Sequence, residues 1–215
     1  FLLETIPVLL ENIGSKRMLV PVENAWQREL LRHFGLDFEE LSGKVVRYDF
    51  AIAKSNWGLY PREDHIHALR SFLSVIHGKR DTQTPRKIFI TRSDNTTRTG
   101  RVPSTRLVET LSTRLGLEVF DPADFPAEIQ FDRFSAAEQI VAPHGSALAS
   151  IVASSALRAL VEIHSSTKVS FHVEYVSRVL EIPYRAVLVD ETKSGKFRRI
   201  PQDVIRTIRE FLEDA

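Results

Sequence analysis

The sequence predicts an α/β protein with a doubly wound, Rossmann-type parallel sheet, and three observations indicate this class. Between residues 81 and 215, short apolar runs alternate with segments of helical periodicity, and this strand–helix unit recurs five times. The links between the units are short, which favours parallel strands wrapped by helices on both faces. The chain has no internal repeat and no long linker, and its 43% hydrophobic residues suffice for a buried core.

Residues 1–80 are predicted to form a partial N-terminal lobe of the same α/β type. Its expected elements are a helix at 1–13, a strand at 17–22, a helix from Asn24 to Gly35, a strand at 45–53 and a helix at 66–76. Asn24 is a favourable N-cap, and glycine adopts the left-handed conformation in which helices commonly end. The polar segment 78–86 contains a proline and is the best candidate boundary, which places the second lobe at 81–215.

The elements of the second lobe follow from the same periodicities. Strands are expected at 87–91, 117–120, 139–142, 159–163 and 184–189. Helices are expected at 104–115, at 126–134, from Ser146, after Ser170 and from Pro201. Leu107, Leu111 and Leu115 share one face of the first of these helices, and Gly116 is its stop signal. Ligands of such sheets bind at the carboxyl ends of the strands, so the loops that follow the strands are the candidate sites.

The composition is that of an ordinary globular protein and excludes several classes. The 29 Lys and Arg residues nearly balance 28 Asp and Glu, and a net charge of +1 gives no field for nucleic-acid binding. The absence of Cys excludes a disulfide framework, a thiolate zinc site and a Cys nucleophile. No apolar run reaches the ~20 residues that a membrane span needs. Because the chain begins with Phe1 inside a helical pattern, we expect it to be part of a longer protein.

Three arginines follow the first strand of the second lobe. Arg92, Arg98 and Arg101 lie in the polar loop after KIFIT. Guanidinium groups bind phosphate oxygens through paired hydrogen bonds, so this loop is a candidate anion site. Three solvated arginines in a surface loop are the more ordinary interpretation of the spacing alone.

Two further strand ends carry candidate residues. His144, Gly145 and Ser146 form a turn into a helix, whose free N–H groups favour an anion, and glycine lets a ligand approach the backbone. His144 can donate to a phosphate or act as an acid, although a structural role is the alternative. Glu162 ends the next strand within an apolar run and needs a partner there, either ribose hydroxyls or an arginine.

Other site types lack support. The chain has neither the Gly-x-Gly-x-x-Gly turn of dinucleotide-binding proteins nor a phosphate-binding P-loop. His65 and His67 lie two apart on a predicted helix, so they point to different faces and do not favour a shared metal. We therefore expect no metal site and no cofactor.

The loops form an ordered set of motifs: IFITRS, GRVPST, FPAEIQFDRFSAAEQIVAPHGSALAS and ALVEIH. This set resembles the glycosyltransferase family 61 domain, which has a GT-B fold and uses nucleotide sugars. The first residues, FLLETIPVLLE, are similar to the segment after the family's Trp-His motif, so the resemblance runs from residue 1 to about 190.

The resemblance implies a nucleotide-sugar donor in the C-terminal lobe and a saccharide acceptor. Carried over by position, Arg92 and Arg101 hold the diphosphate together with His144 and the backbone at Gly145 and Ser146. Glu162 takes the ribose hydroxyls. Gln130 and Glu128 shape the crevice wall, and Arg98 is a further candidate. No residue is assigned as the catalytic base.

The sequence also departs from the family pattern. Ser104-Thr105 stand where Asn-Glu is usual, and Ala147 and Ser150 stand where the turn usually has Gly and Asn. These changes bear on donor identity and on activity.

The expected activity is therefore sugar transfer from a nucleotide sugar to a saccharide, inverting and independent of metal. The chain length and charge leave the oligomeric state open, and the lack of Cys favours a cytoplasmic prokaryotic enzyme of surface-polysaccharide assembly, held near a membrane by its acceptor. The alternatives are a polysaccharide pyruvyltransferase, a homologue that binds without turnover, and an unrelated α/β domain.

Overall fold

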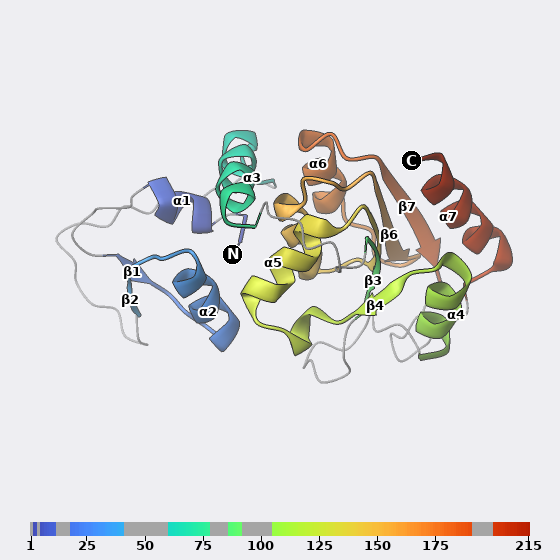
Figure 1. The fold of residues 1–215 in the computed structure, drawn as a ribbon, viewed down its shortest axis with the longest axis horizontal. Helices are drawn as coiled ribbons and strands as arrows, with labels where there is room; N and C mark the ends of the chain where they lie inside the picture. The colour runs from blue at the N-terminus through green and yellow to red at the C-terminus, as the bar shows by residue number, and fades with distance from the viewer. Residues whose placement is uncertain are drawn as a thin grey trace.

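Five parallel strands form the central sheet of the protein in the computed structural model (Figure 1). The strands are β3 (Lys87–Ile90), β4 (Glu118–Phe120), β5 (Gln139–Pro143), β6 (Ala159–Ser165) and β7 (Tyr184–Val189). The structure describes residues 2–3, 5–11, 18–40, 60–77, 86–91, 105–190 and 200–215. Each strand lies close to its predicted position, and the sheet confirms the α/β class and a Rossmann-like arrangement.

The spatial order of the strands is β4-β3-β5-β6-β7, and every neighbouring pair is parallel. The chain begins this sheet at β3, adds β4 on one side, and then adds β5, β6 and β7 on the other. Because the direction of winding reverses between β3 and β5, the loops that leave these two strands diverge. Doubly wound proteins bind their ligands in the crevice that opens at this point.

Helices cover both faces of the sheet. They are α4 (Thr105–Leu115), α5 (Ala127–Ala136), the 3-10 helix η2 (Ser146–Ala153), α6 (His172–Val179) and α7 (Gln202–Asp214). Figure 1 shows α4 and α7 on one side of the sheet, with α5 and α6 on the other. On β6, Leu160 belongs to the apolar cluster under α5, η2 and α6, and Val161 belongs to the cluster under α4 and α7. Glu162 and His164 continue the Leu160 row, because side chains alternate along a strand.

The N-terminal elements are α1 (Thr5–Glu11), β1 (Leu19–Val20), α2 (Ala25–His33), β2 (Glu39–Glu40) and α3 (Glu63–His77), and β1 and β2 form a parallel pair. The predicted cap of α2 is confirmed, since Asn24 Oδ1 accepts a hydrogen bond from Gln27 N at 3.0 Å. Gly35 has the left-handed φ of 63° expected after a helix. The strand predicted at 45–53 lies outside the described residues.

The N-terminal helices pack against the sheet lobe. Leu30 of α2 and Ile66 and Leu69 of α3 belong to the same buried cluster as Ile88 and Ile140 of the sheet, and α3 contacts α5, α6 and η2. The apolar core is therefore continuous across the boundary expected after residue 80. That boundary stays a prediction, because residues 78–85 are among those the structure does not describe.

Two histidines face each other where α2, α3 and α5 meet. His77 Nδ1 donates to Asp132 Oδ1 at 2.6 Å, and the Nε2 atoms of His33 and His77 lie 2.9 Å apart. The two rings stack with centroids 5.0 Å apart. With Nδ1 of His77 protonated, its Nε2 accepts the single proton shared with neutral His33. A second proton on this contact would place two N–H groups head to head.

The His33–His77 contact predicts a loss of stability in mild acid. Burial, followed by the facing His77 ring, lowers the pKa of His33, against the opposing effect of Glu128, Asp132 and Glu29. A histidine with a lowered pKa binds fewer protons when folded than when unfolded. Its stabilising contribution is therefore complete above the ordinary pKa of about 6.5 and is lost as the pH falls below it.

The test is urea denaturation of the wild type and of His33→Gln at several pH values from 8 to 5. The wild type is expected to lose free energy of unfolding below about pH 6.5, with a smaller slope in the variant. His67→Gln, which changes an exposed histidine of α3, is the matched control and keeps the wild-type slope. An equal slope in His33→Gln and the wild type would contradict this account.

Candidate functional site

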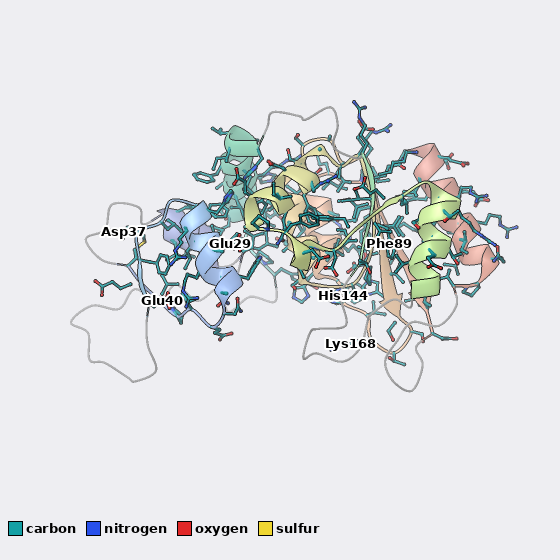
Figure 2. The ribbon with its side chains drawn as sticks, turned by 60° about the horizontal axis from the view of Figure 1, so that its bottom comes forward. Glu29, Asp37, Glu40, Phe89, His144 and Lys168 are labelled. Carbon is teal, nitrogen blue, oxygen red and sulfur yellow. The ribbon has the colours of Figure 1, made fainter. Side chains whose placement is uncertain are left out.

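A cavity of about 550 Å³ lies at the carboxyl ends of β3 and β5, at the point where the winding reverses. Thr91 follows β3 at its wall, and His144 follows β5. The opposite wall includes Trp26 and Glu29 of α2. Figure 2 shows His144 at the same end of the sheet as Lys168, which follows β6. The cavity therefore lies where doubly wound sheets bind their ligands, and α2 forms part of its wall.

The turn after β5 lies at the wall of this cavity. His144 N donates to Ile163 O of β6 at 2.9 Å, which attaches the turn to the sheet. The next bond of the turn is Leu148 N to Gly145 O at 3.1 Å, so the N–H groups of Ser146 and Ala147 precede the first bond within η2. Both residues line the cavity, and the free end of a helix favours an anion.

Gly145 has an extended backbone, with φ 179° and ψ 167°, that any residue can adopt. A Cβ atom added there would meet only Pro143 O, at 3.9 Å. The fold therefore does not require glycine at this position. Its effect is to leave the cavity wall without a side chain beside the first N–H groups of η2.

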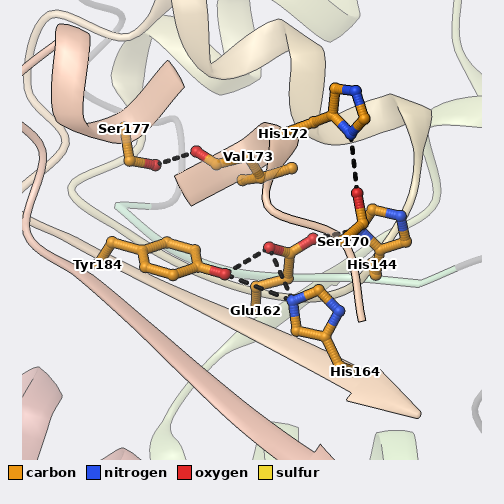
Figure 3. A network of polar contacts seen from close by, with 8 residues as sticks. All are labelled: His144, Glu162, His164, Ser170, His172, Val173, Ser177 and Tyr184. Atoms are coloured by element: carbon orange, nitrogen blue, oxygen red, sulfur yellow. Dashed lines mark hydrogen bonds and ion pairs between the residues drawn. The ribbon is translucent and has the colours of Figure 1, made fainter. Parts of the chain in front are cut away.

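The His144 side chain is held in position by a buried polar network of Glu162, His164 and Tyr184 (Figure 3). Its Nδ1 lies 2.5 Å from Glu162 Oε1, and the second carboxylate oxygen accepts from the Tyr184 hydroxyl at 2.6 Å. His164 Nε2 lies 3.1 Å from that same oxygen, and the ring of His164 stacks on His144 with centroids 5.1 Å apart. Glu162 and His164 have no exposed surface.

The network keeps Glu162 ionised. Burial raises the pKa of Glu162, but the hydrogen bonds from His144, His164 and Tyr184 together outweigh burial and lower the pKa to about 2. Burial and the bond to this carboxylate raise the pKa of Tyr184. Tyr184 is therefore a donor at all physiological pH values, and Glu162 is an acceptor.

An ionised Glu162 determines which nitrogen of His144 carries a proton. A carboxylate can only accept, so His144 Nδ1 donates to it, and Nε2 lies on the far side of the ring. The His144 side chain lines the cavity and is 16% exposed. In this orientation Nε2 can accept a hydrogen bond when neutral or donate one to an anion when protonated.

Among the residues that the structure describes, His144, Glu162 and His164 form a group with metal-ligand spacing, their ligand atoms lying within 4.8 Å of one another. Zinc ligands at 2.0–2.1 Å in a tetrahedral site are about 3.3 Å apart. His144 Nδ1 and Glu162 Oε1 are instead in hydrogen-bond contact, closer together than two ligands of one zinc ion. Metal at this position would require the network to open.

The structure brings together only part of the predicted site. His144, Gly145, Ser146 and Gln130 line one cavity, and Gln130 Nε2 also donates to Phe125 O at 2.8 Å.

Two of the predicted residues do not line the cavity, and three lie outside the described residues. Glu162 is fully buried behind His144. Its carboxylate is therefore not exposed to a ligand in this arrangement, as the predicted ribose contact would require. Glu128 is exposed, because residues two apart on a helix point to different faces and Gln130 takes the cavity side of α5. Arg92, Arg98 and Arg101 lie outside the described residues; in the sequence, Arg92 is the residue after Thr91, which lines the cavity.

Several site residues were not predicted. His164 had a usable signal, because it lies two residues after Glu162 and so shares its face of β6. Asp121, which lines the cavity, had one too, since it directly follows the strand β4. Trp26 lies on a helix distant in sequence, and no local pattern connects it to the cavity.

The described helices include none long and apolar enough to cross a membrane. No curated protein matches the chain. The family described as Glycosyltransferase 61 matches residues 1–161, which includes the N-terminal helices, β3, β5 and the His144 turn and ends one residue before Glu162. This match covers most of the sequence, so the chain belongs to glycosyltransferase family 61 and is a glycosyltransferase.

Proposed function

We propose that this glycosyltransferase takes its sugar from a nucleotide sugar and transfers it to a hydroxyl group of a saccharide. The observation that carries the proposal is the His144 turn, where a ring nitrogen and the free N–H groups of Ser146 and Ala147 border one cavity. These groups are complementary to the oxygens of a diphosphate. The sheet would then be the donor-binding lobe of a GT-B enzyme, and the N-terminal helices would belong to its acceptor side.

The proposed reaction is a direct displacement with inversion. The acceptor oxygen forms a bond to the anomeric carbon while the bond from that carbon to the diphosphate oxygen breaks. The hydroxyl proton goes to a general base, and the nucleoside diphosphate leaves with the bonding electron pair. His144 and the N–H groups of η2 would stabilise the negative charge that develops on the leaving group.

The arginines of the loop after β3 are proposed to supply further positive charge. Arg92 and Arg101 follow Thr91, which lies at the cavity wall, and Arg98 lies between them in sequence. Cationic side chains and helix termini can neutralise a leaving diphosphate, so we propose that the reaction needs no metal at the donor. The lack of Cys supports a cytoplasmic prokaryotic enzyme of polysaccharide assembly.

The experiment that tests this function is calorimetric titration of the chain with UDP, GDP, CDP and CMP, first without metal and then with Mg²⁺. We expect one nucleotide to bind selectively without metal. Arg92→Ala or Arg101→Ala should weaken that binding about 10- to 100-fold, the effect of one charge-assisted hydrogen bond.

Arg133→Ala is the control, because Arg133 lies on α5 in an ion pair with Glu118 and does not line the cavity. Flat titrations with all four nucleotides would contradict the proposal. Stabilisation by phosphoenolpyruvate instead would indicate a pyruvyltransferase.

A further inference from the structure

The wall of the same cavity also carries a carboxylate at a strand end, Asp121. It directly follows β4, the strand that neighbours β3, and Thr91 N bonds to Phe120 O at 2.9 Å, so the ends of the two strands are joined. Asp121 Oδ1 accepts from Ala123 N at 3.0 Å and begins the 3-10 helix η1 (Pro122–Asp124). Within the described part of the chain, Asp121 Oδ2 accepts no hydrogen bond, and the half-buried side chain lines the cavity.

An aromatic side chain lines the same cavity as this carboxylate. Phe125 lines the cavity and is 38% exposed, which leaves ring surface available to a ligand. Its ring packs on Phe120 with centroids 5.2 Å apart, and its carbonyl accepts from Gln130 Nε2 at 2.8 Å. The ring is therefore supported from behind by the fold, as a stacking surface for a flat ligand needs to be.

Glu162 cannot take ribose hydroxyls without giving up its present partners. Its two oxygens hold His144, Tyr184 and His164, and it has no exposed surface. A carboxylate whose oxygens are both engaged in positioning a histidine has a different role from one that accepts a hydrogen bond from a ligand hydroxyl. Among the described residues, two carboxylates line this cavity: Glu29 of α2, whose Oε1 accepts from Ala127 N at 2.8 Å, and Asp121, which directly follows a strand of the sheet.

We propose that Asp121 accepts the ribose hydroxyls of the donor nucleotide and that Phe125 is the surface on which its base stacks, while Glu162 positions His144. This inference rests on the proposed nucleotide-sugar function. In doubly wound sheets an acidic residue at the end of the strand beside the first strand of the crevice binds the ribose. Asp121 follows β4, the neighbour of β3, and η2 follows β5 on the other side of β3.

The test is titration of the full chain with UDP, GDP and CDP and with their 2′-deoxy counterparts. The wild type is expected to bind the ribonucleotide about tenfold more tightly than the deoxynucleotide, the effect of one hydrogen bond to a charged group. Asp121→Asn is expected to abolish this preference and leave binding of the deoxynucleotide nearly unchanged. Asparagine keeps an Oδ1 acceptor for Ala123 N, so the start of η1 is preserved.

Two further variants make the test specific. Asp124→Asn changes an exposed carboxylate of the same helix that does not line the cavity, and it should retain the ribose preference. Phe125→Ala should weaken nucleotide binding about tenfold and leave the binding of inorganic diphosphate unchanged.

Two outcomes would overturn the assignment. If Asp121→Asn keeps the ribose preference, or Glu162→Gln alone abolishes it, ribose does not bind Asp121. If the wild type binds no nucleotide at all, the proposed function fails, and this inference fails with it. If the wild type binds nucleotide but the ribose preference does not depend on Asp121, only this inference fails.

Discussion

Replacing His144 with alanine is expected to slow sugar transfer about 10²- to 10³-fold, the usual cost of removing one preorganised donor to developing negative charge. The ring lines the cavity, and its bond to Glu162 directs Nε2 away from the carboxylate. Because the charge on the diphosphate grows as the glycosidic bond breaks, the effect should fall on kcat more than on KM.

The measurement is the initial rate of nucleotide release from the donor that the titrations identify, with and without acceptor. His172→Ala is the control, since His172 is exposed and pairs with Ser170 away from the cavity. Thermal melts should show that both variants fold. A His144→Ala enzyme with the wild-type kcat would remove His144 from the reaction.

Replacing Glu162 with glutamine is expected to destabilise the fold by about 3 kcal/mol at pH 7 and also to lower kcat. The lowering of the pKa of Glu162 from 4.5 to about 2 measures how strongly the folded protein favours the carboxylate, at about 1.4 kcal/mol for each unit. The neutral amide of glutamine lacks the negative charge that the hydrogen bonds of the network stabilise. Its NH₂ group is also a donor, and facing His144 it would favour the tautomer whose Nδ1 carries no proton.

The pH dependence of the free energy of unfolding tests whether the Glu162 carboxylate is ionised in the folded protein. A carboxylate with a lowered pKa contributes stability that is complete above its ordinary pKa of about 4.5 and is lost as the pH falls towards 2. The difference in free energy of unfolding between wild type and Glu162→Gln should therefore be full at neutral pH and shrink through this window. A difference that does not change between pH 5 and 2 would contradict the ionised network.

Glu138→Gln is the matched control for stability. Glu138 pairs with Arg86 and Arg158 at the opposite end of the sheet, where solvent screens the pairs, and its loss should cost less than about 1 kcal/mol. A readout specific to positioning is the ¹⁵N spectrum of His144, in which Glu162→Gln should reduce the Nδ1-protonated form. Unchanged His144 signals would assign Glu162 a purely structural role.

Much of the secondary structure was predictable because its signals are local. Asn24 caps α2 through a hydrogen bond to a residue three positions on, and Gly35 and Gly116 have the left-handed φ of 63° and 64° that their positions after helices indicate. The strands were found from short apolar runs for the same reason. The 3-10 form of η2 was not predicted, because its first residues resemble those of an α-helix.

The partners of Glu162 show where local signals end. An acid in the apolar run ALVEIHS demands a partner, and this much is readable from the sequence. That Tyr184 supplies one depends on the register of β6 and β7, in which Leu160 pairs with Tyr184 and Glu162 lies two residues further on the same face. Strand register is a long-range property, so the sequence left ribose and arginine as the candidates.

The sequence by itself determined the family, the α/β class and the His144 turn, because motifs and periodicities are properties of neighbouring residues. Only the tertiary structure decided that Glu162 is enclosed while Asp121 borders the cavity, and that Trp26 reaches the same space from α2. Burial depends on which helices pack over which strand ends. That packing joins segments nearly a hundred residues apart, as in the 2.8 Å bond from Ala127 N to Glu29 Oε1.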